Sequence, residues 1–420
     1  MNAPETSTLL IDDFAATPRS LRVALVSETY PPEVNGVAMT LERQVNGLRA
    51  RGHDLQIVRS RHSRSEQQPQ AEDGLEQVLM RSLPIPTYPQ VRFGLPAKSA
   101  LVRLWSLRRP DLVHVATEGP LGWSALHAAR KLKLPVCTDF HTNFHAYSRH
   151  YGVGWLQKPI AAYLRKFHNA ADCTLVPTSS LKHELEALGF ERLLVVGRGV
   201  DTHRFHPRQR RAELRATWGA AEGDCVALFV SRLAPEKNLP LLAQAFAAMQ
   251  QVQPNAKLVV VGDGPERAHL QALCPQAILC GMRTGDDLAH HYASADVFVF
   301  PSQTETYGNV IPEAMASGLA VLAYEYASAA ELIRHQDNGL LARFGDSAGF
   351  IALAQQLVRT PEQVAAMRVA ARTRTEALDW SQIVLQTETL WMNMVRDHAA
   401  GQDAVARGWP RWTQPSALQQ

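Results

Sequence analysis

The arrangement of apolar residues constrains the fold of this chain more than any other feature, because strand-sized apolar runs alternate with helical patterns. Gly36 opens the first helical pattern, in which Val37, Leu41, Val45 and Leu48 recur at helical spacing. In the first half of the chain the strand-sized runs fall at residues 21–27, 55–58, 112–116, 136–140, 173–177 and 193–196. Strands separated by helices in this way predict a parallel sheet with helices on both faces.

The same alternation begins afresh after residue 200, with strand-sized runs at 226–230, 257–261, 278–279, 297–300 and 320–323. A chain of 420 residues also exceeds what one hydrophobic core usually supports. We therefore predict an α/β fold of two doubly wound, Rossmann-like domains, residues 21–199 and 200–379, facing each other across a cleft. Residues 380–398 read as a helix that packs on either domain, and residues 1–20 and 399–420 as a flexible leader and tail.

Cysteine spacing and hydropathy indicate the cell compartment in which the protein is expected. The five cysteines are widely spaced and never form Cys-x-x-Cys, which argues against a disulfide framework and against a zinc knuckle. No apolar run approaches the roughly 18 residues of a membrane span, and the first 20 residues lack the pattern of a signal peptide. We expect a cytoplasmic protein.

The charge is unevenly divided along the chain. Residues 20–198 carry 23 Lys and Arg against 15 Asp and Glu, a surplus of +8, whereas residues 199–420 carry 19 against 22. An anionic membrane surface would suit such a basic half, and an ordinary solvated surface is the alternative. Residues 155–167 alternate aromatic and aliphatic residues with bases, as an interfacial helix does, although a core helix with a basic outer face has the same pattern. Nucleic acid is not expected, because the basic residues are dispersed.

Two carboxylates eight residues apart form the strongest local signal. Glu305 follows an apolar strand, and Glu313 lies in the helix that begins near Val310. A helix start suits an anion, and carboxylates suit the hydroxyl groups of a sugar and a ribose, so the pair predicts a sugar-nucleotide site. Solvated acids near a helix start are the alternative. The residues between them are included in the predicted donor site: Thr306, Tyr307, Gly308, Asn309 and Val310.

Two cations follow an earlier strand of the second half. Arg232 and Lys237 lie at a strand's carboxyl end, where they can converge on one diphosphate and neutralise it as a leaving group. Gly262 and Gly264 follow the next strand and are assigned to nucleotide binding, with a plain tight turn as the alternative. No Asp-x-Asp pair is present to hold a divalent ion, so we expect no metal and no cofactor beyond the donor itself.

The first half contributes two further candidates. Gly36, in the loop between a strand and a helix, would let backbone approach the donor phosphates. His141 is the first polar group beyond another apolar strand, where a structural histidine is the commoner explanation. No Gly-x-Gly-x-x-Gly follows the first strand, which disfavours a dinucleotide-binding fold.

Together these motifs resemble family 4 of the retaining nucleotide-sugar glycosyltransferases, which have the GT-B architecture. The resemblance implies that Glu305 and His141 contact the donor sugar, that Glu313 binds the ribose, and that Arg232 and Lys237 bind the diphosphate. It also implies that the last helix crosses back to the first domain. One departure lies at residues 323–331, where many relatives have Gly-Gly. The segments that carry the likeness are 30–37, 117–122, 140–144, 199–201 and 304–309.

The likeness within the family is to GDP-mannose-dependent α-mannosyltransferases and related sulfoquinovosyl and glycolipid enzymes. We therefore expect a retaining transferase that moves mannose from GDP-mannose to a glycolipid or glycan acceptor, peripherally at the inner face of a membrane. A UDP-sugar-dependent glucosyl or sulfoquinovosyl transferase, a nucleotide-sugar epimerase and a non-enzymatic sugar-binding protein are the alternatives. The four polar residues Arg232, Lys237, Glu305 and Glu313 argue against the last of these.

Overall fold

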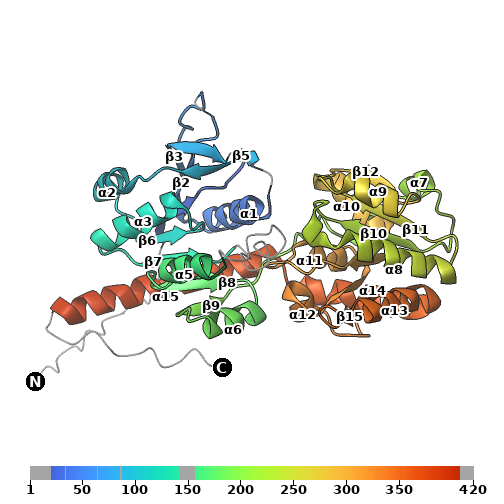
Figure 1. Ribbon diagram of the computed structural model, residues 1–420. Coiled ribbons are helices and arrows are strands. Elements are labelled where there is room, and N and C mark those ends of the chain that lie inside the picture. Colours follow the sequence, from blue (N-terminus) through green and yellow to red (C-terminus); the bar gives the residue numbers. More distant parts are fainter. Residues whose placement is uncertain (1–19, 34, 64, 86–87, 142–156, 407–420) are drawn as a thin grey trace, which may run out of the picture.

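Two parallel sheets, each covered by helices, make up the computed structural model, which describes residues 20–33, 35–63, 65–85, 88–141 and 157–406 (Figure 1). The predicted α/β class with two doubly wound domains is thereby confirmed. Among the described residues, no helix is long and apolar enough to cross a membrane.

The first sheet has seven strands in the order β3-β2-β1-β6-β7-β8-β9, all parallel. The chain moves outward from β1 on one side and returns to β6 on the other, so the topological switch point lies between them. Its strands are β1 (Arg22–Ser27), β2 (Asp54–Ser60), β3 (Leu75–Met80), β6 (Leu112–Val115), β7 (Val136–Asp139), β8 (Cys173–Val176) and β9 (Leu193–Val195).

Helices cover both faces of this sheet, and a short antiparallel hairpin extends its rim (Figure 1). The helices are α1 (Gly36–Ala50), α2 (Lys98–Leu107), α3 (Pro120–Lys131), α5 (Gln157–His168) and α6 (Ser179–Ala187), and the hairpin strands are β4 (Ser82–Ile85) and β5 (Tyr88–Gly94). The apolar alternation did not predict β3 or the hairpin, because their residues are half-exposed or polar and give no continuous apolar run.

The second sheet has six parallel strands in the order β12-β11-β10-β13-β14-β15, again with a switch point, here between β10 and β13. Its strands are β10 (Val226–Val230), β11 (Lys257–Val261), β12 (Ile278–Gly281), β13 (Val297–Phe300), β14 (Ala320–Tyr324) and β15 (Gly339–Ala342). Its helices are α7 (Ala212–Thr217), α8 (Leu239–Val252), α9 (Arg267–Leu273), α10 (Gly285–Ser294), α11 (Val310–Ala316), α12 (Ala327–Leu332), α13 (Ser347–Arg359) and α14 (Pro361–Glu376).

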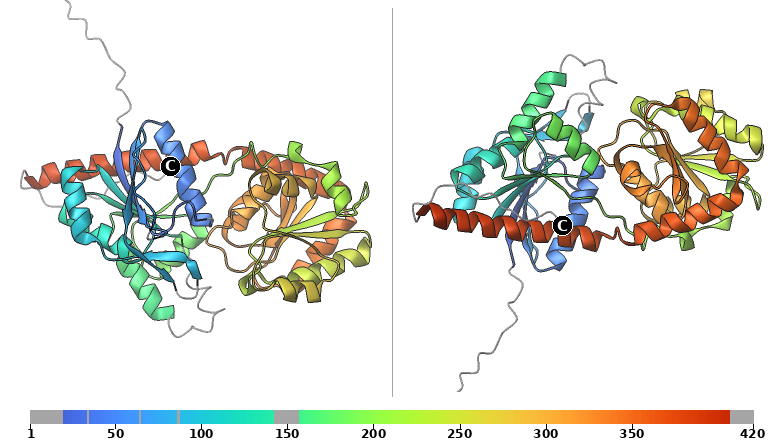
Figure 2. Two further views of the ribbon diagram at one scale, coloured as in Figure 1. Left: turned by 90° about the horizontal axis from the view of Figure 1, so that it is seen from above. Right: turned by 90° about the horizontal axis from the view of Figure 1, so that it is seen from below.

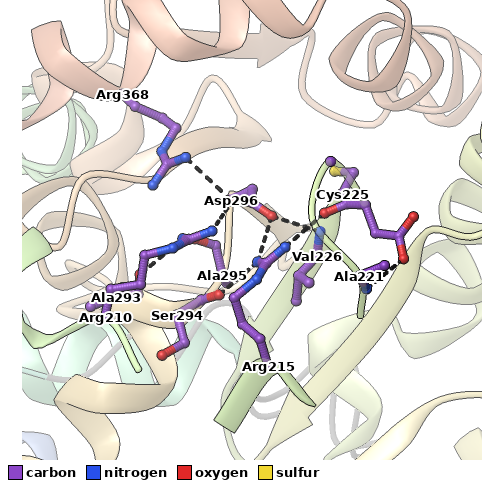
Figure 3. A network of polar contacts seen from close by, with 12 residues as sticks. Arg210, Arg215, Ala221, Cys225, Val226, Ala293, Ser294, Ala295, Asp296 and Arg368 are labelled. Atoms are coloured by element: carbon purple, nitrogen blue, oxygen red, sulfur yellow. Dashed lines mark hydrogen bonds and ion pairs between the residues drawn. The ribbon is translucent and has the colours of Figure 1, made fainter. Parts of the chain in front are cut away.

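Two arginines of the basic stretch that begins the second domain, Arg210 and Arg215, bond one partly buried carboxylate, Asp296. It lies just before β13 and accepts from Arg210 at 2.9 Å, from Arg215 at 2.8 Å and from Arg368 of α14 at 3.3 Å (Figure 3). Burial would raise the pKa of Asp296, but the charge of Arg210, the backbone amide of Val226 and the charge of Arg215 together lower it. The network joins the first segment of the second domain and α14 to the amino end of the sheet. This end lies opposite the edge where ligands of such sheets bind.

The last helix, α15 (Trp380–Ala406), leaves the second domain and runs along the first (Figure 2). Its residues Val384 and Trp391 are buried in one cluster with Leu41 and Val45 of α1. The helix is longer than the predicted 380–398. The expectation of a loosely ordered segment from residue 399 is therefore wrong for residues 399–406, which continue the helix.

Candidate active site

A cavity of about 540 Å³ lies between the two domains. Its lining includes Met39 and Arg43 of α1, Val200 and Trp380 where the chain crosses between domains, and Arg232 after β10. Of the other predicted site residues, the lining includes Gly36, Gly262, Asn309, Val310 and Glu313. Parallel strands end at one edge of each sheet, which explains why motifs far apart in sequence meet in this cavity.

Each predicted diphosphate-binding cation is paired with a carboxylate. Arg232 bonds Glu236, a residue with 4% exposure one helical turn later. Lys237 bonds Glu305 at 2.5 Å, and Ser302 Oγ donates to the same carboxylate oxygen at 2.8 Å. Burial would raise the pKa of Glu236, but its own backbone amide and the cations Arg232 and Lys237 lower it. The two cations are thus oriented by carboxylates within one short turn.

Glu236 was missed by the sequence reasoning, although its spacing of four residues from Arg232 was a usable signal. Arg43 and Tyr292 were missed as well, because nothing in the sequence places either beside Glu313.

Glu313 lines the cavity between the domains and is partly exposed. Tyr292 Oη donates to its carboxylate at 3.0 Å. Burial raises the pKa of Glu313 to about 7, although the Tyr292 hydroxyl and the charge of Arg43 both oppose the shift. A carboxylate so placed gains from any ligand that supplies further hydroxyl donors, and a ribose has two.

The amino-terminal loop and the second domain approach each other at Gly36. The side-chain nitrogen of Asn309 lies 3.8 Å from where a Cβ of Gly36 would be. Asn35 caps α1 by accepting from the amides of Val37 and Ala38. The glycine therefore lies at the start of α1 and faces Asn309 of the second domain.

Gly262 and Gly264 have the positive φ values of 129° and 158°. A Cβ on Gly262 would lie 1.9 Å from the Ser231 carbonyl oxygen, and one on Gly264 would lie 2.2 Å from that of Leu233. Only glycine allows the two loops to touch in this way. Gly262 lines the cavity, whereas Gly264 packs against the loop that carries Arg232.

The loop between Glu305 and Val310 belongs to the predicted donor site and is called the donor loop. It turns at Gly308, where φ is 87°. Ser328 at the start of α12 holds this turn, because its amide donates to the Tyr307 carbonyl and its hydroxyl to that of Gly308. The Tyr307 ring is 4% exposed and its hydroxyl donates to the Arg198 carbonyl at 3.1 Å. Tyr307 thus directs its side chain toward the domain junction, and like Thr306 and Gly308 it is not among the cavity lining.

His141 lies beside the cavity, in a small space of about 20 Å³ that Arg198 also lines. Its Nε2 faces Asp139 Oδ2 at 3.1 Å, and Nε2 of His114 faces the same oxygen at 2.9 Å. Burial alone would raise the pKa of Asp139, yet the two histidines hold it well below the usual range. Residues 142–156, which complete the motif that begins at Phe140, lie outside the described residues.

Within the described part of the chain, no group of three or more His, Cys, Asp or Glu side chains is placed to hold a metal ion.

The cavity between the two Rossmann-like domains is lined by Arg232 and Glu313, whereas Lys237 and Glu305, which bond each other, are not among its lining. This arrangement agrees with one class of protein, the nucleotide-sugar glycosyltransferases of GT-B architecture. The family model described as Glycosyltransferase Family 4 matches residues 34–204, and that described as Glycosyl transferases group 1 matches residues 224–360. This chain belongs to glycosyltransferase family 4.

Relatives of known name agree with this membership. A GDP-mannose-dependent alpha-mannosyltransferase of Mycobacterium tuberculosis is 36% identical over 78% of this chain and 85% of its own length. The sulfoquinovosyl transferase SQD2 of Arabidopsis thaliana is 31% identical over 89% of this chain and 73% of its own. Among solved structures, a sucrose-phosphate synthase from Thermosynechococcus elongatus superposes with a TM-score of 0.72 at 19% identity, covering 90% of this chain and 100% of that one. That likeness shows the fold alone.

Proposed function

We propose that this glycosyltransferase moves mannose from GDP-mannose to a glycolipid acceptor with retention of anomeric configuration. The observation that carries the proposal is the pair of cations Arg232 and Lys237, oriented by Glu236 and Glu305 at the carboxyl end of β10. The donor is proposed from relatives named GDP-mannose-dependent alpha-mannosyltransferase, which are 32–36% identical. The acceptor class is proposed from relatives named for glycolipids, among them an alpha-monoglucosyldiacylglycerol synthase.

The reaction breaks the bond between the sugar carbon and the diphosphate oxygen, and the diphosphate leaves with the electron pair. Arg232 and Lys237 stabilise the negative charge that grows on it, and they need little reorganisation because their neighbours already hold them. The acceptor hydroxyl attacks on the same face of the sugar, and its proton passes to the leaving phosphate. Glu305 is proposed to meet the donor sugar, and Glu313 the ribose.

A direct test uses the full chain with a panel of donors, namely GDP-mannose, UDP-glucose, UDP-sulfoquinovose and ADP-glucose. A donor that binds the folded state raises the melting temperature, and product analysis with a diacylglycerol or glycosyl-diacylglycerol acceptor identifies transfer. We expect stabilisation and transfer with GDP-mannose alone. Transfer from a UDP-sugar would replace this donor assignment, and conversion of the donor to its epimer without transfer would contradict the proposal.

We also propose that the first domain docks on an anionic membrane at the inner face, where a glycolipid acceptor is presented. The support lies in α5, whose outer face carries the exposed Lys158, Arg165 and Lys166. Leu164 and Phe167 are buried in the domain and Tyr163 is 43% exposed, so the described part of the helix favours the alternative of a core helix with a basic outer face. Docking would therefore be electrostatic. Residues 155 and 156 of the predicted segment lie outside the described residues.

A further inference from the structure

Arg198 is a nearly buried cation at the junction of the two domains. It lies between the end of β9 and Val200, on the segment that carries the chain into the second domain, and its exposed fraction is 8%. Buried charges are normally paired, yet among the described residues no carboxylate lies within 4 Å of its guanidinium nitrogens. Burial lowers the pKa of Arg198, which means that burying this charge costs free energy. We therefore expect the arginine to have a specific role at this position.

On one side Arg198 fixes the imidazole of His141. Its Nη2 donates to His141 Nδ1 at 3.0 Å. A guanidinium can only donate, so Nδ1 must be the acceptor, and the ring proton lies on Nε2, which faces Asp139 at 3.1 Å. The imidazole therefore bridges a buried cation and a buried carboxylate.

On the other side Arg198 contacts the donor loop of the second domain. Its guanidinium carbon lies 5.7 Å from the centre of the Tyr307 ring, and its carbonyl accepts from the Tyr307 hydroxyl at 3.1 Å. Tyr307 is two residues from Glu305, and Ser328 holds the same turn. One residue thus touches the imidazole of the first domain and the donor loop of the second.

We propose that Arg198 is a positioning residue for sugar transfer, which holds the ring of His141 with Nδ1 as acceptor and the proton on Nε2, and sets its place relative to the donor loop. Arg198 acts through His141, so its loss changes the rate of transfer and not the binding of the nucleotide. The proposal rests on the proposed function, in which His141 meets the donor sugar.

The test compares Arg198→Gln, His141→Ala and the double variant by steady-state transfer from GDP-mannose and by calorimetry with GDP. We expect Arg198→Gln to lower kcat about tenfold or more and to change GDP affinity less than about twofold. In the His141→Ala background the same substitution should have little further effect, because residues that act through one another are not additive. Equal losses in both backgrounds would overturn the proposal.

A second variant and a spectroscopic signature keep the proposal testable if Arg198→Gln folds poorly. Arg198→Lys retains the buried charge and should recover part of kcat, and wild-type kcat in both variants would refute a positioning role. Imidazole ¹⁵N spectra of the full chain should show His141 as the Nε2–H form, and the opposite tautomer would refute the proposal even if no donor were turned over. Arg192→Gln, an exposed arginine of the same domain, is the matched control and should leave kcat unchanged.

Discussion

The cations of the candidate site are oriented before any donor arrives. Glu236 holds Arg232, and Glu305 with Ser302 holds Lys237, so that both charges lie within one turn after β10. Electrostatic stabilisation of a leaving group is most effective when its donors need not reorganise. A carboxylate beside each cation keeps the unliganded site close to neutral, and the diphosphate then adds its own charges to groups already in place.

Arg232→Ala and Lys237→Ala are each expected to lower kcat by about 10²-fold or more, the scale for losing a donor aimed at developing charge. Steady-state transfer measures this, with circular dichroism to confirm the fold. Arg359→Ala, at the exposed end of α13, is the control. Near-normal kcat in both site variants would remove the diphosphate assignment.

Treatment with EDTA is expected to leave transfer unchanged, because Arg232 and Lys237 are predicted to supply the charge that a divalent ion supplies elsewhere. The measurement is the transfer rate before and after chelation. A loss that Mg²⁺ or Mn²⁺ restores would contradict this prediction.

Glu313 should make nucleotide binding depend on pH. Its pKa of about 7 lies above the ordinary 4.5, so its ionised form, which accepts from ribose hydroxyls, grows between pH 6 and pH 8. GDP affinity should rise about tenfold over that range in the wild type and stay flatter in Glu313→Gln, which controls for ionisation of GDP itself. The same raised pKa means that the unliganded protein loses stability as pH rises from 4.5 through 7, so the variant should gain relative to wild type at pH 8. An identical pH dependence of affinity in both proteins would contradict the ribose assignment.

The contact between α1 and α15 depends on a glycine inside a helix. A Cβ on Gly47 would lie 2.5 Å from a methyl group of Val384. On the same side of the contact Arg51 and His53 both bond the buried carboxylate of Glu388. The close approach lets the last helix of the chain lie on the first helix of the fold, with nearly the whole sequence between them.

Gly47→Ala tests this packing, because two effects of opposite sign compete. A helical glycine replaced by alanine gains about 0.5–1 kcal/mol in propensity, whereas overpacking costs about 1–3 kcal/mol. We expect a net loss of stability on the order of 1 kcal/mol by denaturant unfolding, smaller when Val384→Ala is also present. Gly401→Ala, on α15, would place a Cβ that meets nothing within 4 Å and should gain stability instead. A gain from Gly47→Ala as well would show that the two helices do not touch there.

The two domains are joined by two adjacent segments of chain. The amide of Val200 donates to the Leu378 carbonyl at 2.9 Å, and Gly199 packs against Trp380, where a Cβ would come within 2.8 Å of the ring. A second contact between the domains lies away from this connection, where the carboxylate of Glu331 on α12 accepts from the amide of Ser179 at the start of α6. The two connecting segments line the cavity at Gly199, Val200 and Trp380, and the polar contact of Glu331 with Ser179 joins the domains outside its lining.

Vesicle co-sedimentation tests the membrane proposal on the whole molecule. We expect pelleting with anionic but not neutral lipid at low salt, and release as salt rises, because each base near the surface contributes about 1 kcal/mol. Replacing Lys158, Arg165 and Lys166 by Gln should weaken it. The same change at Arg130, Lys131 and Lys133, at the far end of α3, removes equal charge from the same domain and should have less effect. Equal losses would exclude α5 as the docking face, and no lipid-dependent pelleting would indicate a soluble acceptor.

The sequence by itself predicted the two parallel sheets, because strands buried on both faces are nearly continuously apolar. The carboxyl ends of such strands share one edge, so the polar motifs that follow them were expected at one site. The sequence placed Arg232, Lys237, Glu305 and Glu313 in motifs, and their roles remain predictions. Strands that are half-exposed, such as β3, left no such mark.

Only the tertiary structure decided which groups share an environment. The pairing of Lys237 with Glu305, the hydrogen bond that Glu313 accepts and the contacts of Arg198 join residues that are between 21 and 109 positions apart. Local patterns record which face of an element is buried, but not which distant side chain covers it. The packing of two domains against each other sets burial and charge at the junction, and no single segment of the sequence contains that information.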